Sequence, residues 1–292
     1  MFLEILLYTA LGFFYLFICC WRINRNQLYQ ENGHDFQKSL TFRTLFWLSP
    51  VLLISLWGIL GSTGWVSSMW LPSPLKVAEA LIHLLSSGKL VEATLLSLKR
   101  IAIGFTASAF FGTFLGLLAG TFLMARMLVI PSTSFLRYIP PTAFISLVVV
   151  YMGVDELYKY TVIFISTLFF NVSMVFDVVE DMDYRYVEMA KVAGFNKKNL
   201  FFRIILPYSA PRIVDVLRIN LSAAWTFLVV AEIIGASGGL GHLIAISQRF
   251  SRIDELYAGI IAFGIIGLVT DASIERLSHV FFRWHTLSLK KG

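Results

Sequence analysis

Charged side chains are scarce in this sequence. They make up 14% of its 292 residues, whereas hydrophobic residues make up 57% and the mean hydropathy is +0.74. A soluble domain carries roughly 25% charged residues, so this composition excludes an ordinary water-soluble protein. The apolar runs are continuous instead of alternating in short segments, which excludes a transmembrane barrel. We therefore predict an all-α integral membrane protein, because helices satisfy their own backbone groups in lipid.

Disulfides, clustered metal ligands and phosphate-binding loops are also missing. The two cysteines, Cys19 and Cys20, are adjacent, which excludes a disulfide framework. None of the five histidines is spaced with another metal-ligating residue. No Gly-x-x-x-x-Gly-Lys-Ser/Thr loop is present to bind the phosphates of a nucleotide. The sequence thus predicts a protein that is not an enzyme and that holds no cofactor or metal of its own.

Apolar runs long enough to cross roughly 30 Å of hydrocarbon recur along the chain. They predict a polytopic helical bundle with spans at residues 2–20, 44–61, 101–124, 127–152, 160–179, 213–235 and 256–277. The first run begins with Glu4 where a secretory signal has basic residues, and it lacks a small-residue cleavage site before Trp21. We therefore expect this run to be a retained span.

Lysine and arginine predict the orientation of these spans. Sixteen of them fall in one set of alternate loops, which includes residues 180–212 and the C-terminal end, and seven fall in the other set. The positive-inside rule places the richer set in the cytoplasm. We expect a multi-pass protein of the plasma or inner membrane with its N-terminus outside and its C-terminus inside. The basic residues are spread over several loops, so no nucleic-acid partner is expected.

The segment 71–100 is predicted to lie outside the membrane on the extracytoplasmic side. Ser73 and Pro74 are suited to start a helix, and Gly88 is suited to end one. This predicts a short amphipathic helix on the outer interface, with an apolar face formed by Leu75, Ala78, Leu81, Ile82 and Leu85.

A polar, basic segment at 181–207 interrupts the apolar chain. Asp181 or Asp183 is suited to cap a first short helix, and Gly194 permits a turn after it. Asn196 is suited to cap a second helix, which we expect Pro207 to stop because proline cannot continue the hydrogen-bond ladder. Two short helices joined by a glycine turn predict a rigid knob, which can transmit motion from a soluble partner into the spans.

The same segment resembles the coupling motif of permease subunits from binding-protein-dependent ABC importers. In that motif Glu-Ala-Ala is followed at fixed spacing by Gly, Ile and Leu-Pro, and here it reads Glu188, Met189, Ala190, Gly194, Ile204, Leu206 and Pro207. Met189 stands where the family usually has alanine. Other stretches look like the nitrate, sulfonate and taurine branch of these permeases, namely residues 70–74, 139–141 and 231–241. The resemblance covers roughly residues 65–285.

The resemblance implies a type I importer permease core together with an additional N-terminal span. Expected divisions are 1–43 for the extra span and a cytoplasmic linker, 44–100 for a span and the outer helix, 101–285 for the core, and 286–292 for a tail. Its implied partners are a cytoplasmic ATPase dimer that holds ATP and magnesium, an extracytoplasmic binding protein, a second permease subunit in an expected homodimer, and membrane lipid. The implied cargo is a small solute such as a sulfonate, taurine or nitrate.

Polar residues within apolar spans are candidates for function because they are costly in lipid. The candidate pathway residues are Pro140, Pro141, Arg218, Ser222, Trp225 and Glu232. Each has a structural alternative: the prolines a packed kink, Arg218 a snorkelling position, and Glu232 a pair with Arg249 or Arg252. Asp271 and Glu275 have Arg276 as a nearby partner, and Gly112, Gly116 and Gly120 predict close helix packing, within the chain or between two copies.

Three other functions are weighed against the importer with an anionic cargo. One is an importer permease for a vitamin precursor or another small organic solute. A self-powered secondary transporter would show an inverted repeat, and no internal repeat is evident. A membrane enzyme would need a facing acid and base at one depth, and none can be assembled from the sequence.

Overall fold

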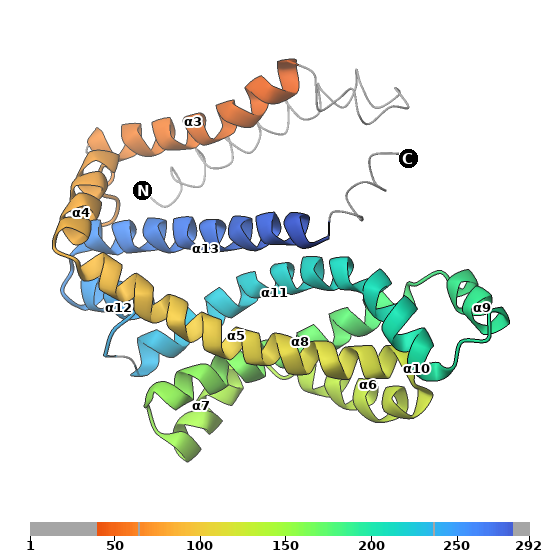
Figure 1. Ribbon diagram of the computed structural model, residues 1–292. Helices are drawn as coiled ribbons and strands as arrows, with labels where there is room; N and C mark the ends of the chain where they lie inside the picture. Colours follow the sequence, from red (N-terminus) through yellow and green to blue (C-terminus); the bar gives the residue numbers. More distant parts are fainter. Residues whose placement is uncertain (1–39, 64, 236, 283–292) are drawn as a thin grey trace. The chain divides into compact units, whose positions relative to one another are not determined.

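The computed structural model describes residues 40–63, 65–235 and 237–282, and every regular element in these ranges is a helix (Figure 1). This confirms the predicted all-α class; the predicted span at 2–20 lies outside the described residues. The elements are α3 (Leu40–Ser62), α4 (Pro74–Ser86), α5 (Lys89–Thr121), α6 (Leu123–Arg137), α7 (Pro141–Met152), α8 (Glu156–Glu180), α9 (Tyr184–Val192), α10 (Lys197–Leu200), the π-helical turn η1 (Phe201–Ile205), α11 (Leu206–Gly235), α12 (Leu240–Arg249) and α13 (Ile253–Phe281).

The chain divides into two compact units, residues 1–79 and 80–292. In the first unit α3 contains the predicted 44–61 span. The end of α3 is tied to the segment that follows it, because the indole Nε1 of Trp57 donates a hydrogen bond of 3.0 Å to the carbonyl oxygen of Pro72. Leu53, Ile54 and Ile59 are exposed, as expected for a helix that faces lipid.

The second unit contains four helical stretches that are long and apolar enough to cross a membrane among the residues described. These are Lys89–Thr121, Glu156–Glu180, Lys197–Gly235 and Ile253–Phe281. A fifth arises if α6 and α7 are counted as one broken span. The predicted spans at 101–124, 160–179, 213–235 and 256–277 therefore each lie largely within an observed helix.

The first helix of this unit begins earlier than its predicted span. Gly88, whose φ is +74°, precedes α5, which starts at Lys89 and not at residue 101. The expected division between residues 100 and 101 thus falls inside one continuous helix. Lys99 and Arg100 directly precede the apolar run in the sequence, yet Arg100 is only 1% exposed and pairs with carboxylates from two other helices.

The predicted outer helix is present as α4 and begins at Pro74 as expected. Its buried positions, however, are Val77, Ala80 and Leu84. The face predicted to be apolar is largely exposed, with Leu75 at 71% and Ile82 at 64%. The helix therefore has two apolar sides, one packed against protein and one open to its surroundings.

Small residues allow α5 and α8 to lie in close contact along their length (Figure 1). A Cβ atom on Gly112 would lie 2.5 Å from the Cβ of Asn171, and one on Gly116 would lie 2.7 Å from the Cβ of Val175. Gly120 meets Val179 in the same way. Of the two expected uses of this glycine face, the structure confirms the one within the chain.

The predicted span at 127–152 is broken into two helices. α6 ends at Arg137, α7 begins at Pro141, and the two axes are bent by 95°. Two successive prolines remove two backbone donors, and Pro140 takes the extended conformation that precedes a proline (φ −55°, ψ 127°). The predicted interruption at Pro140 and Pro141 is confirmed, and it is a sharp turn instead of a slight kink.

A buried polar network joins α5, α8 and α11. Asn171 donates to the hydroxyl of Ser108 at 2.9 Å and accepts from the amide of Asn220 at 2.7 Å. The Thr167 hydroxyl lies 2.7 Å from that of Ser108. In an apolar interior these bonds satisfy groups that would otherwise be costly, so they fix the relative positions of the three helices.

Candidate functional site

The polar segment after α8 folds as the sequence predicts at its start. Asp183 caps α9, because its Oδ1 accepts a hydrogen bond of 3.0 Å from the backbone N–H of Arg185. Asp181 does not cap the helix and instead lies 3.4 Å from the guanidinium of Arg212. Asn196 caps α10 by accepting from the backbone N–H of Asn199 at 2.8 Å.

Gly194 ends α9 in the manner expected of a left-handed residue. Its φ is +78°, its N–H donates to the carbonyl of Lys191, and the N–H of Phe195 donates to the carbonyl of Ala190, both at 3.0 Å. These two bonds form a Schellman motif, which satisfies the last carbonyls of the helix. The turn is therefore fixed by the backbone, and α9 is a short helix with both ends capped.

The Asp183 cap predicts how α9 responds to acid. Hydrogen bonds from the Arg185 side chain and backbone hold the pKa of Asp183 below its ordinary value. The ionised Asp183 carboxylate therefore contributes fully to the stability of the fold above the ordinary carboxyl pKa of about 3.9. This stabilisation is lost as the pH falls through the lowered pKa of Asp183 in the folded state. At neutral pH, Asp183→Ala should speed hydrogen exchange in residues 184–192. Asp183→Asn keeps the acceptor and should protect α9 better than alanine; equal exchange in all three proteins would contradict the cap.

One face of α9 is exposed and could contact a partner. Val192 is 90% exposed and Met189 is 59% exposed. Glu188 is also exposed, and its side chain forms no hydrogen bond or ion pair with any residue that the structure describes. Ala190, by contrast, is buried at 3% exposure and faces the protein. The motif residues Glu188 and Met189 thus lie on the open side of α9 and Ala190 on its packed side.

The chain remains helical through Leu206 and Pro207, and the prediction that this pair stops the second helix is wrong. α10 passes into the π-turn η1 and then into α11, whose second residue is Pro207. The N–H of Leu206 donates to the carbonyl of Phe201, five residues earlier. The wider π-turn offers a physical reason: it relieves the clash of the proline ring with the preceding turn.

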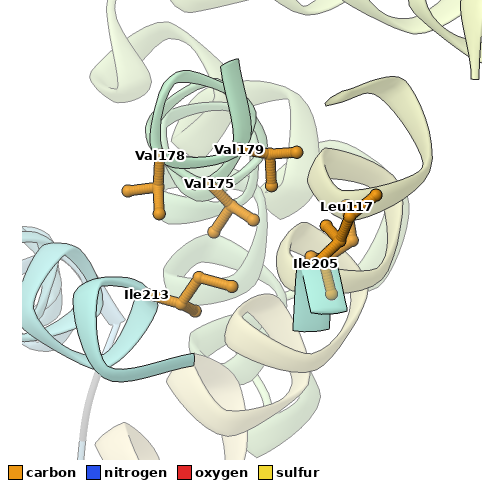
Figure 2. Packing of buried hydrophobic residues seen from close by; sticks show 6 residues of the cluster. All are labelled: Leu117, Val175, Val178, Val179, Ile205 and Ile213. Atoms are coloured by element: carbon orange, nitrogen blue, oxygen red, sulfur yellow. The ribbon is translucent and has the colours of Figure 1, made fainter. Parts of the chain in front are cut away.

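Apolar side chains anchor this segment to the ends of three long helices. Figure 2 shows Ile205 of η1 beside Leu117 of α5, with Val175, Val178 and Val179 of α8 and Ile213 of α11 in the same buried cluster. Met182, Leu200, Phe201 and Leu206 pack against this cluster. Both ends of the α9–α10 segment are therefore held in the core of the helical unit.

At the opposite end of this unit, near α12 (Figure 1), Arg100 and Glu232 form a buried ion pair. The Nη1 of Arg100 lies 2.7 Å from Oε1 of Glu232, and the two side chains are 1% and 0% exposed. Arg100 also donates to Glu156 at 2.6 and 3.0 Å, and Glu156 in turn accepts from Lys159 at 2.6 Å. Glu232 therefore pairs with Arg100, and the expected partners Arg249 and Arg252 are wrong.

The same ion pair holds the connection between α11 and α12. Arg100 donates to the carbonyl of Gly238 at 2.6 Å, and Glu232 accepts from the backbone N–H of Gly241 at 2.7 Å. Gly239 has φ +113°, and a Cβ there would lie 2.3 Å from Oε1 of Glu232. The glycines in this loop let the backbone approach two buried charges; we call the set Arg100, Glu232, Gly238, Gly239 and Gly241 the buried clamp.

The other candidate pathway residues lie in different environments. Arg218 donates to both oxygens of Asp271 at 3.0 and 2.9 Å and to Glu275 at 3.2 Å, so the expected partnership of these acids with Arg276 is wrong. Ser222 is exposed. Trp225 is buried, stacks edge-on against Phe263, and its indole nitrogen has no partner among the described residues. Ser222 and Trp225 therefore do not share one open surface.

The sequence pattern did not predict that Arg100, Glu156 and Lys159 belong to a polar site. Arg100 was counted as a loop residue, although a buried carboxylate such as Glu232 requires a cation near the same depth. This requirement could have indicated the pair of Arg100 and Glu232 from the sequence. The helix α12 was also not predicted, because its ten residues are too few to resemble a span.

Comparison with known families agrees with the family that the sequence resembles and with the fold. A family model described as "Binding-protein-dependent transport system inner membrane component" matches residues 112–284. The chain belongs to this family. It is thus a transmembrane permease component of a binding-protein-dependent transport system, and the matched range contains the segment from α9 to η1.

Individual relatives cover most of this permease. The aliphatic sulfonates transport permease protein SsuC of Bacillus subtilis is 32% identical over 237 residues, which is 81% of this chain and 86% of SsuC. The taurine transport system permease protein TauC of Escherichia coli is 28% identical over 80% of this chain and 87% of its own. A chain of the MetNI methionine ABC transporter in an inward-facing conformation aligns with a TM-score of 0.56 at 16% identity, covering 66% of this chain and 95% of that one. This last likeness concerns the fold.

Proposed function

We propose that this permease works in an ATP-driven importer and receives the force of ATP hydrolysis through α9. The observation that carries this proposal is the exposed, unpartnered Glu188–Met189 face on a helix whose both ends are fixed. Movement of a partner bound to α9 would pass through Ile205 and its neighbours into α5, α8 and α11. ATP and magnesium would lie on that partner, an ATPase dimer, because this sequence has no phosphate-binding loop.

We further propose that the cargo is a small solute bearing a sulfonate or a related anionic group. The support is that relatives named for aliphatic sulfonates and for taurine cover most of the chain. A soluble binding protein would deliver the solute to the outer side, and two copies of this permease would form the pathway. The predicted charge asymmetry would place α9 in the cytoplasm and the buried clamp on the opposite side.

Reconstitution into liposomes tests this function. The permease would be combined with its ATPase and its binding protein, and uptake of a radiolabelled alkanesulfonate would be measured with ATP on the ATPase side. We expect uptake only when all three proteins and ATP are present. Uptake that persists without the ATPase, driven by an ion gradient, would instead identify a secondary transporter.

Two substitutions separate coupling from folding. Glu188→Lys reverses an exposed charge, and Gly194→Val strains the left-handed turn after α9. Both should lower ATP-dependent uptake about 5- to 150-fold, the range of ordinary coupling free energies, while the protein stays folded in the membrane. Gly88→Val is the matched control, since Gly88 is also left-handed (φ +74°, ψ −11°) and lies between α4 and α5, away from the motif. An equal loss of uptake in this control would contradict a specific role for the α9 turn.

A further inference from the structure

The bend between α6 and α7 encloses a small cavity against α8. Its volume is about 10 Å³, which is room for roughly one water-sized sphere. Most of its lining is apolar, and Arg137 and Ser166 are the two lining residues with polar side chains. Ser166 is the eleventh of the 25 residues of α8, so the cavity lies beside the middle of a membrane-spanning helix.

Arg137 brings a positive charge to this cavity without a carboxylate bound to it. Its side chain forms no hydrogen bond or ion pair with any residue in the described ranges. Its guanidinium carbon lies 6.0 Å from the ring centre of the exposed Tyr138, and Asp177 acts on it only through its electric field. At the other end of α6, Arg126 does pair with Glu180. An unpaired cation beside the middle of a span is costly unless an anion or water accompanies it.

The hydroxyl of Ser166 is a buried polar group without a partner. The residue is 3% exposed, and its Oγ forms no hydrogen bond with any of the described residues. Thr161 and Thr167 of the same helix donate to the carbonyl oxygens four residues earlier. Ser166 makes no such bond, although burial makes an unsatisfied hydroxyl costly. A ligand in the cavity that accepts a hydrogen bond would remove this cost.

The N-terminus of α7 adds positive potential at the same place. Pro141 and Phe144, both from its first turn, line the cavity. No side chain caps this helix, so the positive end of its dipole is not balanced by a capping group. A cation, a free hydroxyl and a helix N-terminus therefore converge on one small cavity, and all three favour an anion.

From this convergence we propose that the cavity binds one halide ion, such as chloride. The hydroxyl of Ser166 donates a hydrogen bond to the ion, Arg137 balances its charge, and the apolar lining excludes competing water. The volume selects against phosphate, sulfate and sulfonate groups, because each is larger than a single halide ion. The site is thus distinct from any binding of the proposed cargo. Its bound ion lets Arg137 remain beside the middle of a span.

Anion titration of the full-length permease tests this site. The purified protein in lipid nanodiscs is placed in sodium gluconate, whose anion is too large for the cavity, and chloride or bromide then replaces gluconate at constant ionic strength. Both halides should raise the midpoint of thermal unfolding until the site is saturated, because they bind the folded state. Bound chloride should broaden the chlorine NMR line, and bromide should reverse the broadening. Methanesulfonate and glycerol phosphate should give no saturable response.

Two variants assign the response to the cavity. Arg137→Gln and Ser166→Ala should each weaken chloride binding at least about tenfold, because each removes a group that acts on a charged ligand. The matched controls lie on α6: Arg126→Gln changes an ion-paired arginine, and Ser132→Ala changes a serine that donates to the carbonyl of Leu128. Both controls should keep the chloride affinity of the unsubstituted protein.

Ser166→Ala also distinguishes a bound ion from a hydroxyl that is merely unsatisfied. If no ion binds, removal of the hydroxyl should raise the unfolding midpoint equally in gluconate and in chloride, and this result would overturn the proposal. A cavity filled only by water would give no halide response in the unsubstituted protein, with the same consequence. An equal response to methanesulfonate or glycerol phosphate would show an open cationic surface in place of an enclosed halide site. None of these measurements depends on uptake, so they test the site separately from the proposed function.

Discussion

Replacing Arg100 with methionine is expected to destabilise the protein by about 3–5 kcal/mol, because it leaves the buried carboxylate of Glu232 without its cation. Glu232 is 0% exposed and, among the residues that the structure describes, would keep the hydroxyl of Ser97 and the N–H of Gly241 as partners. The loop from Gly238 to Gly241 would also lose the bond that Arg100 donates to Gly238. The measurement is the midpoint of thermal or detergent-induced unfolding of the purified protein.

Two further variants make this result specific to a buried pair. Arg126 pairs with Glu180, and both side chains are about half exposed at 47% and 46%; Arg126→Met should therefore cost about 1 kcal/mol or less. The double variant Arg100→Met with Glu232→Gln removes the stranded charge and should recover most of the stability. If the double variant were as unstable as Arg100→Met alone, the loss would not arise from an unpaired Glu232.

Gly116→Leu is expected to force α5 and α8 apart and to cost about 3 kcal/mol, near the upper range for overpacking. Even a Cβ at this position would lie 2.7 Å from the Cβ of Val175 and 2.8 Å from the carbonyl oxygen of Val172. Backbone atoms cannot move aside as a flexible side chain can. The fraction of folded monodisperse protein after purification, together with its unfolding midpoint, measures the effect.

Gly267 of α13 supplies the matched control. A Cβ there would meet nothing within 4 Å, so Gly267→Leu should be neutral or slightly stabilising, because leucine is the better helix former. Shortening the opposing side chain tests the contact directly. Val175→Gly, which removes the Cβ of Val175, should lessen the cost of Gly116→Ala, so that the two losses are less than additive. Strict additivity would show that Gly116 and Val175 do not interact.

Local signals in the sequence predicted several structural details. Asp183 and Asn196 cap their helices, Gly194 forms the left-handed turn, and the prolines at 140 and 141 break a span. These features depend on residues within about six positions of one another, through backbone sterics and short-range hydrogen bonds. The glycine face of α5 was predicted for a similar reason, since its spacing is visible within one helix.

Partners far apart in the chain could not be predicted in this way. The sequence predicts that Arg100 lies outside the membrane because it directly precedes an apolar run, and its partner Glu232 lies 132 positions later. Asp271 and Glu275 were assigned to nearby Arg276, whereas Arg218, 53 and 57 positions away, binds them. Pro207 was expected to end a helix, and the adjoining π-turn allows the helix to continue. In each case the deciding group comes from tertiary packing or from a backbone irregularity.

The sequence alone determined that this protein is helical, lies in a membrane and carries the spaced motif of its permease family, because composition and short-range spacing suffice for each of these. The tertiary structure decided which charges are buried together and how the α9 segment is anchored. The physical reason is the range of the interactions: helix caps and apolar runs are encoded locally, whereas ion pairs and the close packing of glycine against valine exist only once distant helices meet.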